Sequence, residues 1–152
     1  MAKKTIINEF EVPSLEGLEK IDVTIPLKQA CIVVKDAATE NCPTNTGYLK
    51  RSITYNVSGN VGEVGTNVDY APYIEFGTGL FAEDGNGRKT PWGPFPNLEH
   101  KYKPEGWKEG DEIPDFLYTH GQKPQPYLRP ALDSNRDKIV EIFRNAIREG
   151  VK

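Results

Sequence analysis

The sequence predicts an α+β chain, because helical and strand patterns occupy separate stretches of its 152 residues. Apolar residues recur at helical spacing over 27–40 and again from 128 to about 149. Between these two stretches, residues 49–57 alternate between apolar and polar, and a second strand pattern follows at 61–66 after a short turn. Strands joined by so short a connection pair antiparallel.

Length, charge and cysteine usage limit the classes of protein that fit. A chain of 152 residues suits one domain, and a globule of that size buries roughly 68–70% of its unfolded surface. The net charge of −3 argues against a general nucleic-acid binder, which needs a basic face. No apolar run approaches the ~20 residues of a membrane span, so we expect a soluble protein made in the cytoplasm. Cys31 and Cys42 match no metal or redox spacing and are expected to be buried thiols in a reducing compartment.

The N-terminal half begins with residues 1–26, taken as an arm of undetermined structure within a single domain, 1–152. Residues 5–12 alternate loosely and fit either a strand or an ordered arm. The helix expected over 27–40 stops before Pro43, because the residue before a proline disfavours the helical region. Its apolar stripe comprises Ala30, Val33, Val34, Ala37 and Ala38.

The strand that follows places Leu49, Ile53, Tyr55 and Val57 on one face. Its first residues fit equally the end of a helical turn. The tripeptide at 58–60, Ser-Gly-Asn, is typical of a hairpin turn leading into the partner strand.

Residues 66–79 predict a single helical turn. Asp69 is a suitable N-cap, Pro72 falls in the first turn, and Gly77 is placed to end it in a left-handed conformation. One face of this turn carries three large side chains: Tyr70, Tyr73 and Ile74. None of these residues is a nucleophile, a metal cage or a phosphate cradle, which indicates a packing or assembly device.

Residues 77–126 differ in composition from the rest. They hold eight of the 14 glycines, seven of the 12 prolines and both tryptophans. We interpret them as a long ordered excursion, with Asn86 and Gly87 as a hairpin tip, because disordered linkers are poor in aromatics. Its aromatics fit three roles, namely ligand stacking, a protein interface or packing on their own domain. The candidate interface residues are Trp92, Phe95, Tyr102, Trp107, Phe116 and Tyr118.

The last predicted element is a helix running from 128 to about 149, with Gly150 as its C-terminal cap. Asp133 and Asp137 lie early in it while Arg144 and Arg148 lie late, as the helix dipole favours. Its expected buried stripe comprises Leu128, Leu132, Ile139, Phe143, Ala146 and Ile147.

Catalytic chemistry has little support. With His100 and His120 as the only histidines, a set of Ser52, His120 and Asp115 can be drawn, but a chain of this size supplies one by chance. Ser52 also lacks the strand-turn-helix elbow that exposes a nucleophile. We therefore interpret His120 as a solvated loop residue.

Metal and phosphate sites are equally poorly supported. Two acidic clusters, Asp111, Glu112 and Asp115, and Glu83 with Asp84, lack the alternation of a calcium loop and are interpreted as acidic turns. Residues 85–90 superficially suggest a phosphate loop without the strand and helix that such a loop requires. We expect no cofactor and no metal.

Three sequence blocks occur in a fixed order. Residues 43–53 read Pro-x-x-Thr-Gly-x-Leu-x-x-Ser-Ile, residues 70–78 read Tyr-Ala-x-Tyr-x-Glu-Phe-Gly-Thr, and residues 125–132 read Gln-Pro-Tyr-Leu-Arg-Pro-Ala-Leu. This order resembles the tail-component family named after a lambdoid Hong Kong coliphage, whose members are head–tail joining or tail-completion proteins of long-tailed bacteriophages. The resemblance covers most of the chain from Leu27 onward.

The resemblance implies an α+β fold in which a small antiparallel sheet packs against a helix of the N-terminal half and a long C-terminal helix. It implies no enzymatic activity. The protein would be a structural virion component in the neck or upper tail, assembled in the bacterial host cytoplasm as a ring, expected to be six-fold. Its partners would be itself and other neck and tail proteins, with DNA only as passing cargo, no membrane and no small-molecule substrate.

The residues assigned to fold and assembly are Gly47, Leu49, Ser52, Ile53, Asp69, Tyr70, Ala71, Tyr73, Glu75, Phe76, Gly77, Thr78, Pro126, Leu128 and Pro130. Glu75 is expected to be solvated or to pair with Arg51 or Arg129. We expect residues 80–122 to form part of the ring contact. The alternatives are a tail terminator ring, a carbohydrate-binding module using Trp92 and Trp107, and a small hydrolase around His120.

Overall fold

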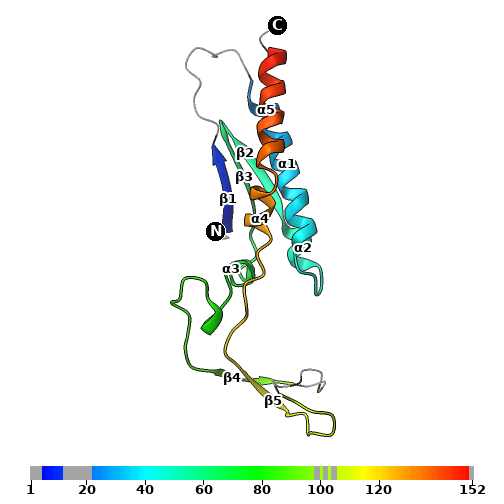
Figure 1. Ribbon diagram of the computed structural model, residues 1–152, viewed down its shortest axis with the longest axis vertical. Coiled ribbons are helices and arrows are strands. Elements are labelled where there is room, and N and C mark those ends of the chain that lie inside the picture. Colours follow the sequence, from blue (N-terminus) through cyan, green and yellow to red (C-terminus); the bar gives the residue numbers. More distant parts are fainter. Residues whose placement is uncertain (1–4, 12–21, 98–99, 101–102, 104–105, 151–152) are drawn as a thin grey trace. The chain divides into compact units, whose positions relative to one another are not determined.

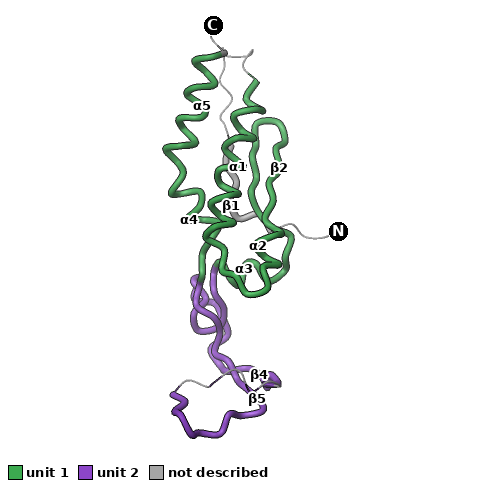
Figure 2. The backbone as a smooth tube through the Cα atoms, turned by 90° about the vertical axis from the view of Figure 1, so that its right-hand side faces the viewer, with its two compact units in different colours: residues 1–75, 125–152 green, residues 76–124 purple. Residues whose placement is uncertain are grey.

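The computed structural model describes residues 5–11, 22–97, 100, 103 and 106–150, and divides the chain into two compact units. Unit 1 comprises residues 1–75 and 125–152, and unit 2 comprises residues 76–124, which are inserted between the two parts of unit 1 (Figure 2). Unit 2 spans nearly the same residues as the excursion expected at 77–126.

The sheet of unit 1 has three antiparallel strands in the order β1-β3-β2. These are β1 (Thr5–Glu11), β2 (Thr54–Ser58) and β3 (Val61–Thr66). Ser58 pairs with Val61, so a two-residue turn joins β2 to β3, and Gly59 occupies its left-handed position with φ 58°. The predicted hairpin is confirmed, and β1 is a strand, one of the two alternatives that the sequence left open for residues 5–12.

Helix α1 (Thr24–Asn41) packs along β2 and β3 and covers one face of the sheet (Figure 1). It begins three residues before the predicted start. Asp22 Oδ1 accepts a hydrogen bond from the Thr24 backbone N–H at 2.9 Å, and hydrogen bonds from Thr24 lower the pKa of Asp22. The helix ends at Asn41, as the following Cys42-Pro43 sequence predicts.

The first residues of the predicted strand form a short helix instead, which was the other conformation that the sequence left open. Helix α2 (Tyr48–Ser52) begins after Gly47, whose φ of 75° favours glycine. Leu49 and Ile53 are both buried, at the helix and at its C-cap. A helical turn places both side chains in the core because residues four apart share a helix face.

The single C-terminal helix predicted from 128 onward is wrong, because the structure has two helices there. Helix α4 (Leu128–Asp133) is separated from α5 (Arg136–Gly150) at Ser134 and Asn135. The Ser134 hydroxyl donates to the Pro130 carbonyl at 2.7 Å, and the Asn135 side-chain amide donates to the Ala131 carbonyl at 2.8 Å. Such side-chain bonds compete with the helical ladder and interrupt it.

The core of unit 1 joins all of its helical layers to the sheet. α1 contacts α4 and α5, and α4 approaches β1. The buried cluster comprises Cys31, Val34, Ala38, Cys42, Leu49, Ile53, Val64, Val68, Ala71, Tyr127, Leu128 and Ala131. Of the stripe expected along the C-terminal helix, Leu128 is buried, while Leu132, Ile139, Phe143, Ala146 and Ile147 are only half-buried.

Unit 2 contains a short 3₁₀ turn (Gly79–Phe81) and a two-stranded antiparallel sheet. Its strands are β4 (Trp92–Pro96) and β5 (Phe116–Thr119). The hairpin tip expected at Asn86-Gly87 is wrong, because both strands of the described sheet lie further along the chain. The Asn86 N–H instead donates to Asp84 Oδ1 at 3.0 Å, a local turn.

Among the described residues, no helix combines the length and the hydrophobicity that crossing a membrane would require.

Candidate assembly site

Glu75 belongs to the second of the three sequence blocks, and its side chain is completely buried in unit 1. It lies in helix α3 (Ala71–Phe76). Its Oε2 accepts hydrogen bonds from the backbone N–H groups of Tyr127 and Leu128 at 2.8 and 3.0 Å. Its Oε1 accepts from the backbone N–H of Arg129 at 3.1 Å. The carboxylate therefore caps a helix that begins 53 residues later in the chain.

The first turn of α4 explains why an acidic residue is needed at this position. The first N–H groups of a helix have no partner within the helix and need one from outside. Here those groups belong to Tyr127, Leu128 and Arg129, all of which bond to Glu75. The next residue, Pro130, has no N–H. One carboxylate thus satisfies every free donor of the turn, and its charge is favourable at a helix N-terminus.

Arg129 balances the charge of Glu75. Its Nε donates to Glu75 Oε1 at 3.1 Å, and its Nη2 donates to the Glu75 backbone carbonyl at 3.3 Å. This pairing decides among the possibilities left open by the sequence. Arg51 is engaged elsewhere, since its Nη1 donates to the Thr46 carbonyl at 3.4 Å.

The aromatic side chains of the same helical turn face outward. Tyr70 is 42% exposed and Tyr73 is 59% exposed, whereas Ile74 packs against the core. The capping role expected for Asp69 is wrong, because α3 begins at Ala71 and the Ala71 N–H donates to the Val68 carbonyl at 3.1 Å. The tyrosines therefore form part of the surface of unit 1.

Two segments of unit 2 run antiparallel beside each other, and we name residues 76–80 and 120–124 the stem. The Thr78 N–H donates to the Gln122 carbonyl, and the Leu80 N–H donates to the His120 carbonyl, both at 2.9 Å. The Gln122 N–H donates to the Thr78 hydroxyl oxygen at 2.9 Å. Thr78 of the second block is thus a positioning residue for the two ends of unit 2.

Glycines allow the two stem segments to approach this closely. A Cβ on Gly79 would overlap the His120 carbonyl oxygen, and one on Gly121 would overlap the Thr78 carbonyl oxygen. A Cβ on Gly77 would lie 2.8 Å from the Gln122 carbonyl oxygen. All three have positive φ, between 61° and 123°. The sequence indicated Gly77 only as a helix terminator; its backbone contact was not predictable.

The first sequence block joins β3 through hydroxyl groups. The Ser52 and Thr66 hydroxyl oxygens lie 2.6 Å apart, and the Ser52 hydroxyl also contacts the Leu49 carbonyl at 2.7 Å. Thr66, which is fully buried, accepts from the Val68 N–H at 3.2 Å. Ser52 therefore links α2 to the strand that precedes α3, which is a structural role.

The structure brings the buried members of the three blocks into one core and leaves others apart. Leu49, Ile53, Ala71 and Leu128 belong to the same cluster. Gly47 lies in the left-handed turn before α2, Pro126 is exposed, and Pro130 is half-buried in α4. Phe76 is 37% exposed.

The candidate interface residues in unit 2 are mostly exposed. Phe95, Phe116 and Tyr118 are 46%, 57% and 66% exposed, and Tyr102 lies outside the described residues. The tryptophans are half-buried and covered by cations of their own unit. Arg88 lies 5.9 Å from the centre of the Trp92 ring, and the Lys103 ammonium lies 3.6 Å from that of Trp107.

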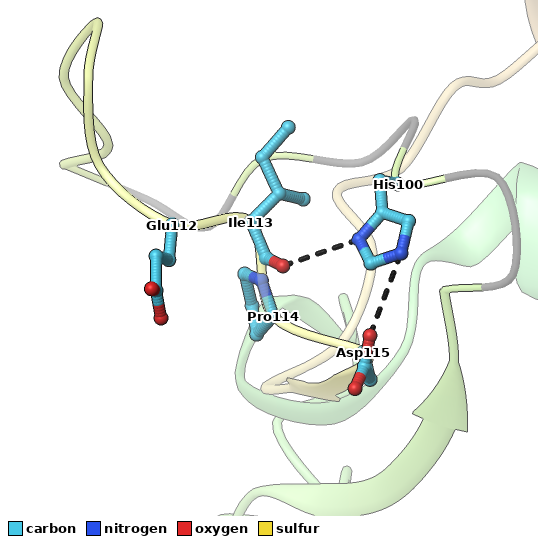
Figure 3. A pocket seen from close by; sticks show the side chains of 5 residues that line it. All are labelled: His100, Glu112, Ile113, Pro114 and Asp115. Carbon is cyan, nitrogen blue, oxygen red and sulfur yellow. Dashed lines mark hydrogen bonds and ion pairs between the residues drawn. The ribbon is translucent and has the colours of Figure 1, made fainter.

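Unit 2 has an open hollow of about 590 Å³ in which His100 and Asp115 form a pair (Figure 3). Its lining residues are His100, Glu112, Ile113, Pro114 and Asp115. His100 Nε2 lies 3.4 Å from Asp115 Oδ1, and Nδ1 lies 3.2 Å from the Ile113 carbonyl. Sequence reasoning linked Asp115 to His120 instead, because neither histidine has a distinguishing local pattern. Both members of the pair are more than half exposed, and Glu112 points away from the imidazole. Within the described ranges, no three His, Cys, Asp or Glu side chains form a metal-binding group.

Both cysteines are buried and free of disulfides. Burial raises the pKa of Cys31 to about 11, with a smaller contribution from Glu63, and it also raises the pKa of Cys42. Both thiols are therefore protonated at neutral pH, as expected for structural rather than reactive cysteines.

Comparison with known proteins gives one match. Residues 17–77 match the model of the HK97-gp10-like family, described as "Bacteriophage HK97-gp10, putative tail-component". The match covers the block at 43–53 and the block at 70–78 up to Gly77, and there it confirms the resemblance to a phage tail component; the block at 125–132 lies outside the matched residues. The matched segment holds α1, the β2–β3 hairpin and α3 with Glu75, and ends at Gly77. Neither the curated proteins nor the solved structures gave a significant match.

Proposed function

We propose, from the match of residues 17–77 to a phage tail-component family, that this protein is a tail-completion or head–tail joining component. In this proposal several copies, six by expectation, form a ring at the neck or upper tail of the virion. Each copy contacts its neighbour through unit 2. The ring also contacts other neck and tail proteins, and DNA passes through it as cargo.

The observation that carries the proposal is that the described part of unit 2 has no hydrophobic core. In the part of 76–124 that the structure describes, the buried residues are Gly77, Gly79 and Asn97, and no hydrophobic side chain is buried. An isolated two-stranded sheet is at best marginally stable in water. Exposed apolar surface on an ordered segment marks a site of protein association. A partner that covers Phe116 and Tyr118, which lie on the same face of β5, would supply burial that unit 2 lacks.

The Glu75 cap lies in unit 1, where the chain leaves for unit 2 and returns from it. Glu75 is the last residue before unit 2, and its partners at 127–129 follow directly after unit 2. The Gln125 N–H donates to the Ile74 carbonyl at 2.8 Å, and this bond joins the two segments of unit 1 between which unit 2 is inserted.

Ring formation requires heterologous interfaces that close. Each is expected to bury about 800 Å² per partner, a typical size for a stable protein interface. The net charge of −3 is compatible with a channel through which DNA passes without binding.

The test is native mass spectrometry of the full chain over a concentration series, beside a variant in which residues 81–119 are replaced by Asn-Gly. The replacement keeps the Thr78–Gln122 and Leu80–His120 pairs and closes them with a hairpin turn. We expect a closed oligomer for the full chain and a folded monomer for the variant. A variant that forms the same oligomer would contradict the role of unit 2, and an unfolded variant would indicate that unit 2 packs on its own domain.

The place in the virion needs a separate experiment. Immunogold electron microscopy of tails should label the head-proximal end. Label confined to the head-distal end of the tail would contradict a neck position. Label at the head-proximal end of free tails, but not at the neck of complete virions, would favour the tail terminator ring.

The carbohydrate-binding alternative loses support from the contacts of its two tryptophans. A sugar stacking on the covered face of Trp107 would have to displace the Lys103 ammonium. Tryptophan fluorescence titrated with common glycans tests this directly, and sugar-dependent quenching would revive the alternative.

A further inference from the structure

Helix α5 has an apolar side that unit 1 leaves incompletely covered. None of its described side chains is buried, although six of its positions from 139 to 147 are apolar. Val140 is 52% exposed. Arg136 and Arg144 lie four residues before and after Val140, on the same side of the helix.

Two basic side chains of α5, Arg144 and Arg148, have no acidic partner among the residues that the structure describes. Arg144 and Arg148 are both exposed and lie one helical turn apart, an arrangement in which like charges repel. Among the described residues neither arginine is within ion-pair distance of a carboxylate, those of Asp137 and Glu141 included, whereas Arg136 pairs with Asp133 at 2.9 Å. The helix dipole favours cations at this end of α5, and an acidic partner would add charge-assisted hydrogen bonds to the two guanidinium groups.

Unit 2 presents the opposite combination of charge and hydrophobicity. Phe116 and Tyr118 alternate with Leu117 and Thr119, so they project from the same face of β5. The segment just before β5 carries four exposed carboxylates against a single lysine: Glu109, Asp111, Glu112 and Asp115, with Lys108. The surface is thus aromatic with an acidic flank, whereas that of α5 is aliphatic with a basic flank.

We propose that these two surfaces bind each other between successive copies of the chain. The Phe116–Tyr118 face of one copy contacts the Val140 side of α5 of the next, and Glu109 and Glu112 face Arg144 and Arg148. This inference rests on the proposed ring and names its contact. Each copy carries both surfaces, so the contact is heterologous and repeats from copy to copy until the ring closes. Complementary charge also disfavours the symmetric α5–α5 contact, which would bring arginines together.

Charge reversal tests the pairing. Variant one carries Arg144→Glu and Arg148→Glu, and variant two carries Glu109→Lys and Glu112→Lys. Alone, each variant brings like charges together at every contact, so we expect its self-association to weaken by more than about 100-fold. Mixed in equal amounts, the two restore complementary contacts only when they alternate. Native mass spectrometry should then find closed rings that contain equal numbers of both variants.

Two further variants control the experiment. The quadruple variant, with all four changes, has complementary charges again and should associate like the wild type. Lys138→Glu with Lys28→Glu matches the charge change of variant one. Lys138 lies two residues from Val140 and faces the opposite side of α5, so this control should also associate normally.

The outcomes separate this inference from the proposed function. If variants one and two assemble as well as the wild type, the α5 contact is wrong but the proposed ring is not contradicted. The same holds if both variants stay monomeric when mixed. A wild type that remains monomeric throughout the concentration series contradicts the ring itself.

Discussion

Arg129 donates a hydrogen bond from Nε to Oε1 of Glu75 at 3.1 Å, across a separation of 54 residues. Glu75 is fully buried, while the Arg129 side chain is 36% exposed. The arginine therefore keeps contact with water while the carboxylate depends entirely on protein donors. Loss of the Glu75 carboxylate should therefore destabilise unit 1.

Glu75→Gln should lower the free energy of unfolding by about 3 kcal/mol, the typical cost of breaking one side of a buried ion pair. The amide removes the charge and turns a donor toward groups that are themselves donors. Urea unfolding followed by circular dichroism measures the loss. Asp133→Asn is the matched control, because it breaks the exposed Arg136 pair and should change stability by less than about 1 kcal/mol. Equal effects of the two substitutions would contradict the capping role.

Gly79→Ala should open the stem of unit 2, because its Cβ would overlap the His120 carbonyl. Gly85→Ala is the control, since Gly85 has a similar φ of 71° but no atom within 4 Å of the added Cβ. Amide hydrogen exchange at Thr78 and Leu80 should accelerate in the Gly79 variant and not in the control. The core of unit 1 should stay protected in both. Unchanged exchange in the Gly79 variant would show that the stem tolerates the overlap.

Tyr127→Phe should leave unit 1 as stable as the wild type or stabilise it by about 1 kcal/mol. The Tyr127 hydroxyl is buried and has no hydrogen-bond partner among the described residues. Its removal relieves an unsatisfied polar group while the ring stays packed. Tyr127→Ala should instead cost about 3–5 kcal/mol through the cavity it leaves. A clear loss of stability in the phenylalanine variant would reveal a partner for the hydroxyl.

Stability should fall in alkaline solution. The Cys31 thiol has a pKa of about 11 in the native protein and 9.0 when unperturbed. Between these values the unfolded chain releases a proton that the native chain retains, so unfolding becomes more favourable as pH rises. Cys31 alone contributes a slope of up to about 1.4 kcal/mol per pH unit, present above pH 9 and ending near pH 11. Cys42 and Tyr127, whose pKa values are also raised by burial, act in the same direction.

The measurement is urea unfolding of the wild type and of Cys31→Ala at a series of pH values from 7 upward. The alanine variant starts from a lower stability because of the small cavity, but it should lose less between pH 9 and 11. Parallel curves for the two proteins would show that Cys31 ionises alike in the folded and unfolded chain.

The local elements were largely predictable from the sequence, because their causes lie within a few neighbouring residues. The β2–β3 hairpin follows from alternation and from a glycine-containing turn, and the end of α1 follows from Pro43. The break between α4 and α5 was missed because the side-chain bonds of Ser134 and Asn135 compete with helix formation at a position where the apolar spacing alone continues.

The candidate site was likewise predictable only in part. The order of the three blocks already indicated a phage tail component, whereas for Glu75 the sequence left open whether it is solvated or paired with an arginine. Which arginine it pairs with was decided only by the tertiary structure, since Arg51 and Arg129 are equivalent as charges. The burial of Glu75 under the first turn of α4, and the glycine contacts of the stem, arise from segments more than 40 residues apart. No local pattern encodes such contacts, because their energies depend on the packing that brings the segments together.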